Sequence, residues 1–309
     1  MRYIVNIGTV SAILDQPSEE LVEYLENFYD IVPITTGHPE AEKLYLWKIF
    51  PIISKPPEES HKNQWGVGIQ KNIQKRELRI YCEINKNLHI SVRKALRDVF
   101  LSFCENRKFT MLHAAAVYNQ SEVLIFVGES QAGKTTLALD AILNRDYKLL
   151  SNDHLILYKN EEFISLTTLP TVITVRTDTY ELNNSKLPNN FLEKDSRFYS
   201  FSFKQLQQNC LTILQPNNFN IKIFVVSWSD SSIKIKKLHG NKTSALSEHI
   251  RTKWMYEECN LGQFIPRDFR DRVSFLSDSQ NLLKELIQCS DISFLMHAGE
   301  IPQGTHNGD

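Results

Sequence analysis

The residues best suited to chemistry form one short run, Gly128-Glu-Ser-Gln-Ala-Gly133-Lys134-Thr135, which matches the pattern G-x-x-x-x-G-K-[ST] in full. Two glycines allow a tight turn in which successive backbone N–H groups point toward phosphate oxygens. The lysine supplies a positive charge for the β- and γ-phosphates, and the threonine hydroxyl suits Mg²⁺. The run therefore predicts a nucleoside triphosphate site.

The whole loop and the start of the following helix should contact the nucleotide. The expected nucleotide-binding residues are Gly128, Glu129, Ser130, Gln131, Ala132, Gly133, Lys134, Thr135 and Thr136. A helix that begins near Lys134 would add the positive end of its dipole. The structural alternative is a glycine turn that merely joins a strand to a helix.

The apolar pattern predicts the elements that must position this loop. Val123–Val127 should form the strand before it, and a helix should run from Lys134 to about Leu143. Met111–Tyr118 and Lys148–Tyr158 are expected as the flanking strands. Further elements are expected as strands at Arg2–Gly8, Leu44–Pro51, Trp65–Gln70, Glu77–Ile84, Thr171–Arg176, Ile221–Trp228 and Ile233–Leu238, and as helices after the N-cap Ser18 and at Ser91–Cys104, Thr243–Arg251 and Ser279–Gln288.

The neighbouring residues narrow the reaction class. A GTPase would carry D-x-x-G and N-K-x-D motifs, and neither follows the loop at a suitable place. A motor or transporter ATPase would carry an apolar strand that ends in Asp-Glu, whereas this chain has Leu149-Leu-Ser-Asn152-Asp153-His154. The loop alone does not name the reaction, because these enzyme classes and kinases share it.

Three segments together resemble the HPr kinase/phosphorylase superfamily of P-loop kinases. They are LHAAAV, GESQAGKTTLAL and LLSNDHLIL, and LPTVITVR at Leu169–Arg176 looks like the next block. The resemblance covers residues 110–180 and implies an α/β fold with a P-loop kinase core of the HPr kinase type. It also implies that the nucleotide is ATP, bound with Mg²⁺. Residues 1–109 carry no part of it.

The resemblance assigns roles to five residues. His113 would lie beside the phosphates, Asn152 and Asp153 would fall on the paired acidic positions, and Arg176 would be the arginine of the later block. Thr135 and Asp153 would hold the metal. We therefore expect His113, Lys134 and Asp153 to converge at the carboxyl ends of adjacent strands.

The chain departs from the family at Asn152, where the family has the base that acts on the acceptor hydroxyl. An amide cannot take a proton, so either Asp153 does this work or the acceptor loses its proton late in a loose transition state. Each candidate also has a structural reading: His113 as a core histidine, Asp153 as the cap of a turn, and Arg176 as one partner of a surface ion pair.

The leading functional hypothesis is an ATP-dependent kinase that transfers the γ-phosphoryl to a Ser or Thr of a peptide or small protein. The peptide kinases that phosphorylate the C-terminal serine of lasso-peptide precursors look like the nearest sub-group. The alternatives are a small-molecule kinase on the same core and a non-catalytic ATP-binding regulatory module. By analogy with the family, a homo-oligomer is a further expectation.

Composition bounds the partners and the compartment. The formal net charge of −1 gives no global basic footprint for nucleic acid. Five scattered cysteines indicate reduced thiols, and no apolar run is long enough for a membrane helix, so a cytoplasmic protein with no membrane partner is expected. The pattern of apolar and polar residues changes near Thr110. This change predicts a mixed α+β N-terminal region that would bind the acceptor (1–109), an ATP-binding domain (110–298) and a flexible tail (299–309).

Overall fold

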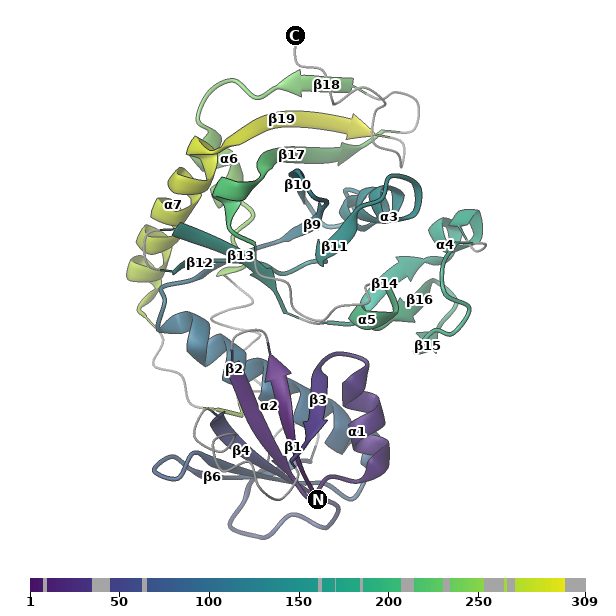
Figure 1. Cartoon of the computed structure of the whole chain (residues 1–309), viewed down its shortest axis with the longest axis vertical. Coiled ribbons are helices and arrows are strands. Elements are labelled where there is room, and N and C mark those ends of the chain that lie inside the picture. Colours follow the sequence, from purple (N-terminus) through teal and green to yellow (C-terminus); the bar gives the residue numbers. More distant parts are fainter. Residues whose placement is uncertain are drawn as a thin grey trace. The chain divides into compact units, whose positions relative to one another are not determined.

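The chain folds into a mixed α/β protein, seen here in a computed structural model (Figure 1). The structure describes residues 1–7, 10–34, 45–62, 66–160, 163–169, 171–183, 186–206, 214–229, 234–252, 264–265 and 270–297. It divides into two compact units, the first formed by Met1–Asn106 with Thr252–Arg270 and the second by Arg107–Arg251 with Asp271–Asp309. The expected tail at 299–309 lies outside the described residues, as do Leu44, Trp65 and Ile233 at the starts of three expected strands.

The first unit is built on a seven-stranded sheet with the strand order β3-β1-β2-β4-β7-β6-β5. Its elements are β1 (Arg2–Ile7), β2 (Val10–Asp15), α1 (Glu19–Glu26), β3 (Asp30–Pro33), β4 (Tyr45–Ile52), β5 (His61–Lys62), β6 (Gly68–Asn72), β7 (Glu77–Tyr81) and α2 (Asn85–Glu105). The predicted N-cap is confirmed, because the Ser18 side chain accepts the N–H of Leu21 at 3.3 Å.

A buried carboxylate explains why later residues return to the first unit. Asp98 on α2 is fully buried, and it accepts hydrogen bonds from the backbone N–H of Phe264 at 2.7 Å and from Arg97 at 2.8 Å. About two helical turns further along α2, Glu105 pairs with Arg270 at 2.9 Å. These two acids tie the described residues of Thr252–Arg270 to α2, a link that no local sequence pattern indicates.

The second unit is built on a six-stranded sheet with the order β11-β9-β10-β17-β19-β18. Its elements are β9 (Ala114–Tyr118), β10 (Glu122–Val127), α3 (Lys134–Asn144), β11 (Lys148–Ser151), β17 (Asn220–Trp228), β18 (Lys234–Lys237), α6 (Lys242–Ser247), α7 (Arg272–Gln288) and β19 (Ser290–His297). β10, β17 and β19 run parallel, and β9 lies antiparallel between β10 and β11. The carboxyl ends of β10, β11, β17 and β19 therefore meet at one edge of the sheet.

Both faces of β10 are buried in this sheet. Leu124 and Phe126 of β10 pack with α3 in one core, whereas Val123, Ile125 and Val127 pack with α7 in another. This doubly covered arrangement explains why β10 reads as a continuous apolar run rather than as an alternating one. The strand before the loop is thus held on both sides.

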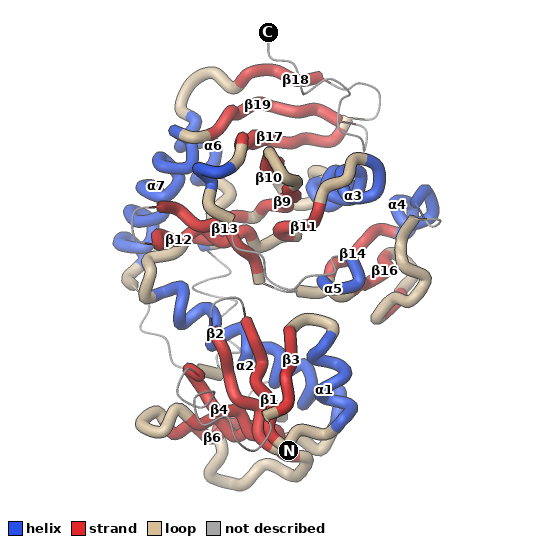
Figure 2. The backbone as a smooth tube through the Cα atoms, in the orientation of Figure 1, coloured by secondary structure: helices blue, strands red, loops and turns tan. Residues whose placement is uncertain are grey.

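Two smaller sheets complete the second unit, with the orders β13-β12-β8 and β14-β16-β15 (Figure 2). Their elements are β8 (Thr110–Leu112), β12 (Leu155–Asn160), β13 (Phe163–Thr168), β14 (Ile173–Arg176), α4 (Thr177–Asn183), β15 (Glu193–Lys194), β16 (Phe198–Phe201), α5 (Phe203–Leu206) and the 3-10 turn Pro216–Asn218. Among the described residues, no helix combines the length and apolar character that a membrane crossing requires.

Two segments that were each expected to form one strand form two separate strands in the structure. Met111–Tyr118 breaks at His113, where the chain leaves the β8 sheet for β9 of the main sheet. Lys148–Tyr158 breaks after Ser151, where β11 of the main sheet gives way to β12 of the other. The breaks fall at His113 and at Asn152 and Asp153, which are the candidate site residues from the sequence. These side chains therefore lie outside the regular alternation of a strand.

Candidate active site

The candidate site lies at the edge of the main sheet where parallel strands end. The loop Gly128–Gly133, called the glycine loop below, follows β10, and Asn152 and Asp153 follow β11. His113 lies at the start of the antiparallel strand β9, and this start meets the same edge. Open α/β sheets bind ligands at this edge.

Close packing explains both glycines of the loop. A Cβ atom on Gly128 would lie 2.7 Å from the backbone oxygen of Val226, and one on Gly133 would lie 2.3 Å from Cε1 of His297. Gly133 also has a left-handed φ of 86° at the N-cap of α3. No other residue type satisfies both demands at position 133.

His297 anchors the loop from the end of β19. Its ring is fully buried, and Nε2 lies 2.8 Å from the backbone oxygen of Ala132. Burial lowers the pKa of His297, although the bond to Ala132 opposes this shift. The ring is therefore neutral near pH 7, and Nε2 carries the hydrogen, since a carbonyl can only accept. The indole of Trp228 packs edge-on against the same ring, with centroids 5.3 Å apart.

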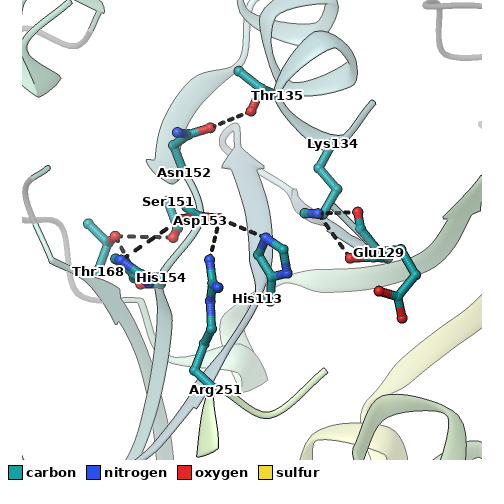
Figure 3. A network of polar contacts seen from close by, with 11 residues as sticks. His113, Glu129, Lys134, Thr135, Ser151, Asn152, Asp153, His154, Thr168 and Arg251 are labelled. Atoms are coloured by element: carbon teal, nitrogen blue, oxygen red, sulfur yellow. Dashed lines mark hydrogen bonds and ion pairs between the residues drawn. The ribbon is translucent and has the colours of Figure 1, made fainter. Parts of the chain in front are cut away.

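Lys134 is folded into the glycine loop (Figure 3). Its Nζ donates to the backbone oxygens of Gly128 at 2.9 Å and Glu129 at 2.8 Å. Burial lowers the pKa of Lys134 to about 8, although the nearby charge of Asp153 acts in the opposite direction. The amine is thus a buried group whose present partners are two neutral carbonyls that only partly compensate its charge.

Thr135 and Asn152 face each other across the start of α3. The Thr135 hydroxyl donates to Oδ1 of Asn152 at 3.0 Å (Figure 3). The family resemblance assigned the metal to Thr135 and Asp153, whereas in the structure the Thr135 hydroxyl is bonded to the amide of Asn152. A hydroxyl and an amide oxygen are hard donors of the kind that Mg²⁺ accepts.

Asp153 is the centre of a charged network. Its Oδ1 lies 2.8 Å from Nε2 of His113 and 2.6 Å from a terminal guanidinium nitrogen of Arg251. Burial alone would raise the pKa of the carboxyl group, but the His113 hydrogen bond and the charges of His154 and Arg251 outweigh it and lower the pKa well below its usual range. Asp153 also holds a left-handed φ of 79°, an unusual conformation for a residue with a side chain.

Several of these side chains line one cavity of about 600 Å³. Its lining includes His113, Ser130, Gln131, Gly133, Lys134, Thr135, Thr136, Asp153, Thr174, Val175, Arg176, Asp178, Thr179, Phe198 and Trp228. His113, Lys134 and Asp153 are therefore brought together. Of the other loop residues, Glu129 contributes its backbone oxygen to Lys134 and Ala132 contributes its own to His297.

Arg176 lies in the same cavity but has a different partner from the one its expected role would need. It stands on β14 and pairs with Asp178 at 3.5 Å, with both side chains more than 60% exposed. The arginine that contacts Asp153 is Arg251, which follows α6. Sequence reasoning missed Arg251, Trp228 and His297, because each stands at the end of an ordinary apolar element and no local motif marks it.

No family model matches the sequence, and a search of curated proteins finds no significant match.

The packing of Gly133 predicts a large cost for a single methyl group. Gly133→Ala should lower the free energy of unfolding by about 2–4 kcal/mol, because a left-handed alanine is strained and the Cβ displaces the buried His297 ring. Gly240→Ala is the matched control: Gly240 has a φ of 99° but nothing within 4 Å of its Cβ position, so only about 1 kcal/mol should be lost. Urea denaturation of both variants measures the difference, and equal losses would contradict the packing explanation.

Proposed function

We propose that this chain is an ATP-dependent phosphotransferase with a P-loop kinase core of the HPr kinase type, and that it transfers the γ-phosphoryl to a Ser or Thr hydroxyl of a peptide or small protein. The observation that supports this most is that one cavity is lined by part of the glycine loop together with Lys134, His113 and Asp153. A phosphate-binding loop beside a charged network of this kind has the parts that phosphoryl transfer requires.

The glycine loop would bind the triphosphate. Lys134 Nζ already lies inside the loop, so it needs only to exchange the oxygens of Gly128 and Glu129 for β- and γ-phosphate oxygens. The N-terminus of α3 points its free N–H groups toward the same place. The neutral His297 ring would keep the loop closed while the phosphates bind.

Thr135 and Asn152 would hold Mg²⁺. Their two oxygens lie 3.0 Å apart, and Mg²⁺ typically takes one or two protein oxygens together with phosphates and waters. When bound, the ion would neutralise phosphate charge. The family's acidic residue at position 152 would add a negative charge here, which the amide of Asn152 avoids.

His113 is better placed than Asp153 to receive the acceptor proton. The Asp153 carboxylate is held ionised by two donors, so it is a weak base. In the tautomer of His113 that donates its Nε2–H to this carboxylate, the other ring nitrogen, Nδ1, is the one that can accept a proton. Asp153 would thus orient His113 and hold Arg251, whose permanent charge suits a transferring phosphoryl group.

Incubation with γ-labelled ATP and a panel of Ser/Thr peptides and hydroxylated metabolites tests the proposal. Wild type should label one acceptor class, and Lys134→Ala should lose transfer while keeping its circular dichroism spectrum. Labelled metabolites without labelled peptides would favour a small-molecule kinase. Tight ATP binding without transfer to any acceptor would favour a regulatory module, which the amide at Asn152 would suit.

The pKa of Lys134 predicts that nucleotide binding takes up a proton. The pKa is about 8 in the free protein, and adjacent phosphates should raise it, so roughly half a proton should be taken up at pH 8 and almost none at pH 6.5. Calorimetric titration with ATP in buffers of different ionisation enthalpy measures this uptake. Lys94→Met is the control, because Lys94 also has a pKa of about 8 but lies on α2 of the first unit.

Uptake should persist in Lys94→Met and disappear in Lys134→Met. Uptake that survives in Lys134→Met, or that disappears in Lys94→Met, would show that Lys134 does not meet the phosphates.

The Asp153 network predicts unequal effects for two neighbouring substitutions. Asp153→Asn should lower turnover by about 10²-fold or more, because the charge that orients His113 and Arg251 is lost. Asn152→Ala should cost less, since that amide orients ligands but moves no proton. Steady-state kinetics over a range of pH measures both. A nearly silent Asp153→Asn beside an inactive Asn152→Ala would mean that the amide is the essential group.

A further inference from the structure

β14 is the outer strand of the sheet β14-β16-β15, and among the described residues its pairing partner is β16 alone (Figure 2). Just beyond β14, the N–H of Thr177 donates to the oxygen of Arg197 at 2.9 Å. Antiparallel pairs alternate between bonded and non-bonded, so Val175–Tyr199 is a bonded pair and Thr174–Ser200 is not. The backbone N–H and C=O of Thr174 therefore point away from β16.

The opposite side of β16 agrees with this pattern. The N–H of Leu192 donates to the oxygen of Ser200 at 2.8 Å, and the N–H of Asp195 donates to the oxygen of Phe198 at 2.9 Å. Ser200 and Phe198 thus direct their carbonyl groups toward β15 and not toward β14. The outward edge of β14 is a short row of backbone groups ready to pair with another strand.

This edge belongs to the cavity of the candidate active site. Thr174, Val175 and Arg176 line the same cavity as Lys134 and His113. Ile173 and Val175 are each 1% exposed in the core beside α3, which fixes the strand, whereas Thr174 and Arg176 are exposed. A strand paired with β14 would consequently run through the cavity in which the phosphates are expected.

The side chains next to this edge favour an acidic peptide. Arg176 stands opposite Phe198 in the strand pair, and the guanidinium of Arg197 lies 5.6 Å from the Phe198 ring. The ion pair between Arg176 and Asp178 is exposed, and pairs of this kind contribute little. Arg176 can therefore turn to a carboxylate on a ligand at small cost.

We propose that the open edge of β14 binds the acceptor as an added β-strand, and that the acceptor is an extended peptide with acidic residues beside its hydroxyl residue. Main-chain hydrogen bonds to Thr174 would supply affinity, and Arg176 with Phe198 would supply preference. This inference rests on the proposed kinase function, and it selects a peptide over a small molecule as the acceptor.

The experiment uses the full chain with a non-hydrolysable ATP analogue and a fluorescent peptide of sequence Glu-Val-Ser-Val-Glu. Anisotropy should show binding, and binding should weaken by about tenfold or more when the valine nitrogens are methylated, because methylation removes the strand hydrogen bonds. The peptide Lys-Val-Ser-Val-Lys should also bind more weakly. Equal affinity for the methylated peptide, or no binding of the first peptide, would overturn the proposal.

Two variants at position 174 separate the contribution of the backbone to peptide binding from that of the side chain. Thr174→Pro removes the outward N–H and should weaken peptide binding by about tenfold, whereas Thr174→Ala keeps the N–H and should bind within about twofold of wild type. Equal affinities of the two variants for the acidic peptide would contradict the proposal that the peptide pairs with the edge of β14. ATP binding should be the same in wild type and in both variants. If wild type binds the acidic peptide but not ATP, the proposed kinase function is wrong, whereas the proposal that the β14 edge binds a peptide still stands.

Discussion

The contact between Gly133 and His297 is the constraint on which the candidate site depends. Without a Cβ atom at position 133, the end of β19 comes close enough for the His297 ring to bond the oxygen of Ala132. The glycine loop then closes, α3 starts at Lys134, and the amine of Lys134 lies inside the turn. One close approach therefore fixes the loop, the helix start and the position of the principal positive charge.

Polar side chains reach the glycine loop at two places where the chain passes from one sheet of the second unit to another. The chain leaves one sheet for another at His113 and again after Ser151, and these breaks turn His113, Asn152 and Asp153 toward the same edge. Asp153 then joins His113 to Arg251 with two short contacts. Partial burial would raise the pKa of this carboxyl group, but the His113 hydrogen bond and the charges of His154 and Arg251 lower it further and keep the group ionised.

The sequence predicted the strand and the helix on either side of the glycine loop well, because their patterns are local. The strand before it, the helix after it and the cap at Ser18 all depend on residues within a few positions of each other. The breaks at His113 and after Ser151 were not predicted, since apolar residues continue on both sides and only the strand pairing tells two sheets apart. Arg251 was missed because its role depends on a residue far away in the chain, and the bond between Asp98 and Phe264 was missed for the same reason.

A crystal structure with Mg²⁺ and a non-hydrolysable ATP analogue would show whether the glycine loop binds triphosphate, because Lys134 must then change its partners. Nζ should leave the oxygens of Gly128 and Glu129 for the β- and γ-phosphates, with the γ-phosphate in the cavity beside His113. An analogue bound elsewhere, with Lys134 still bonded to both carbonyl oxygens, would contradict this prediction.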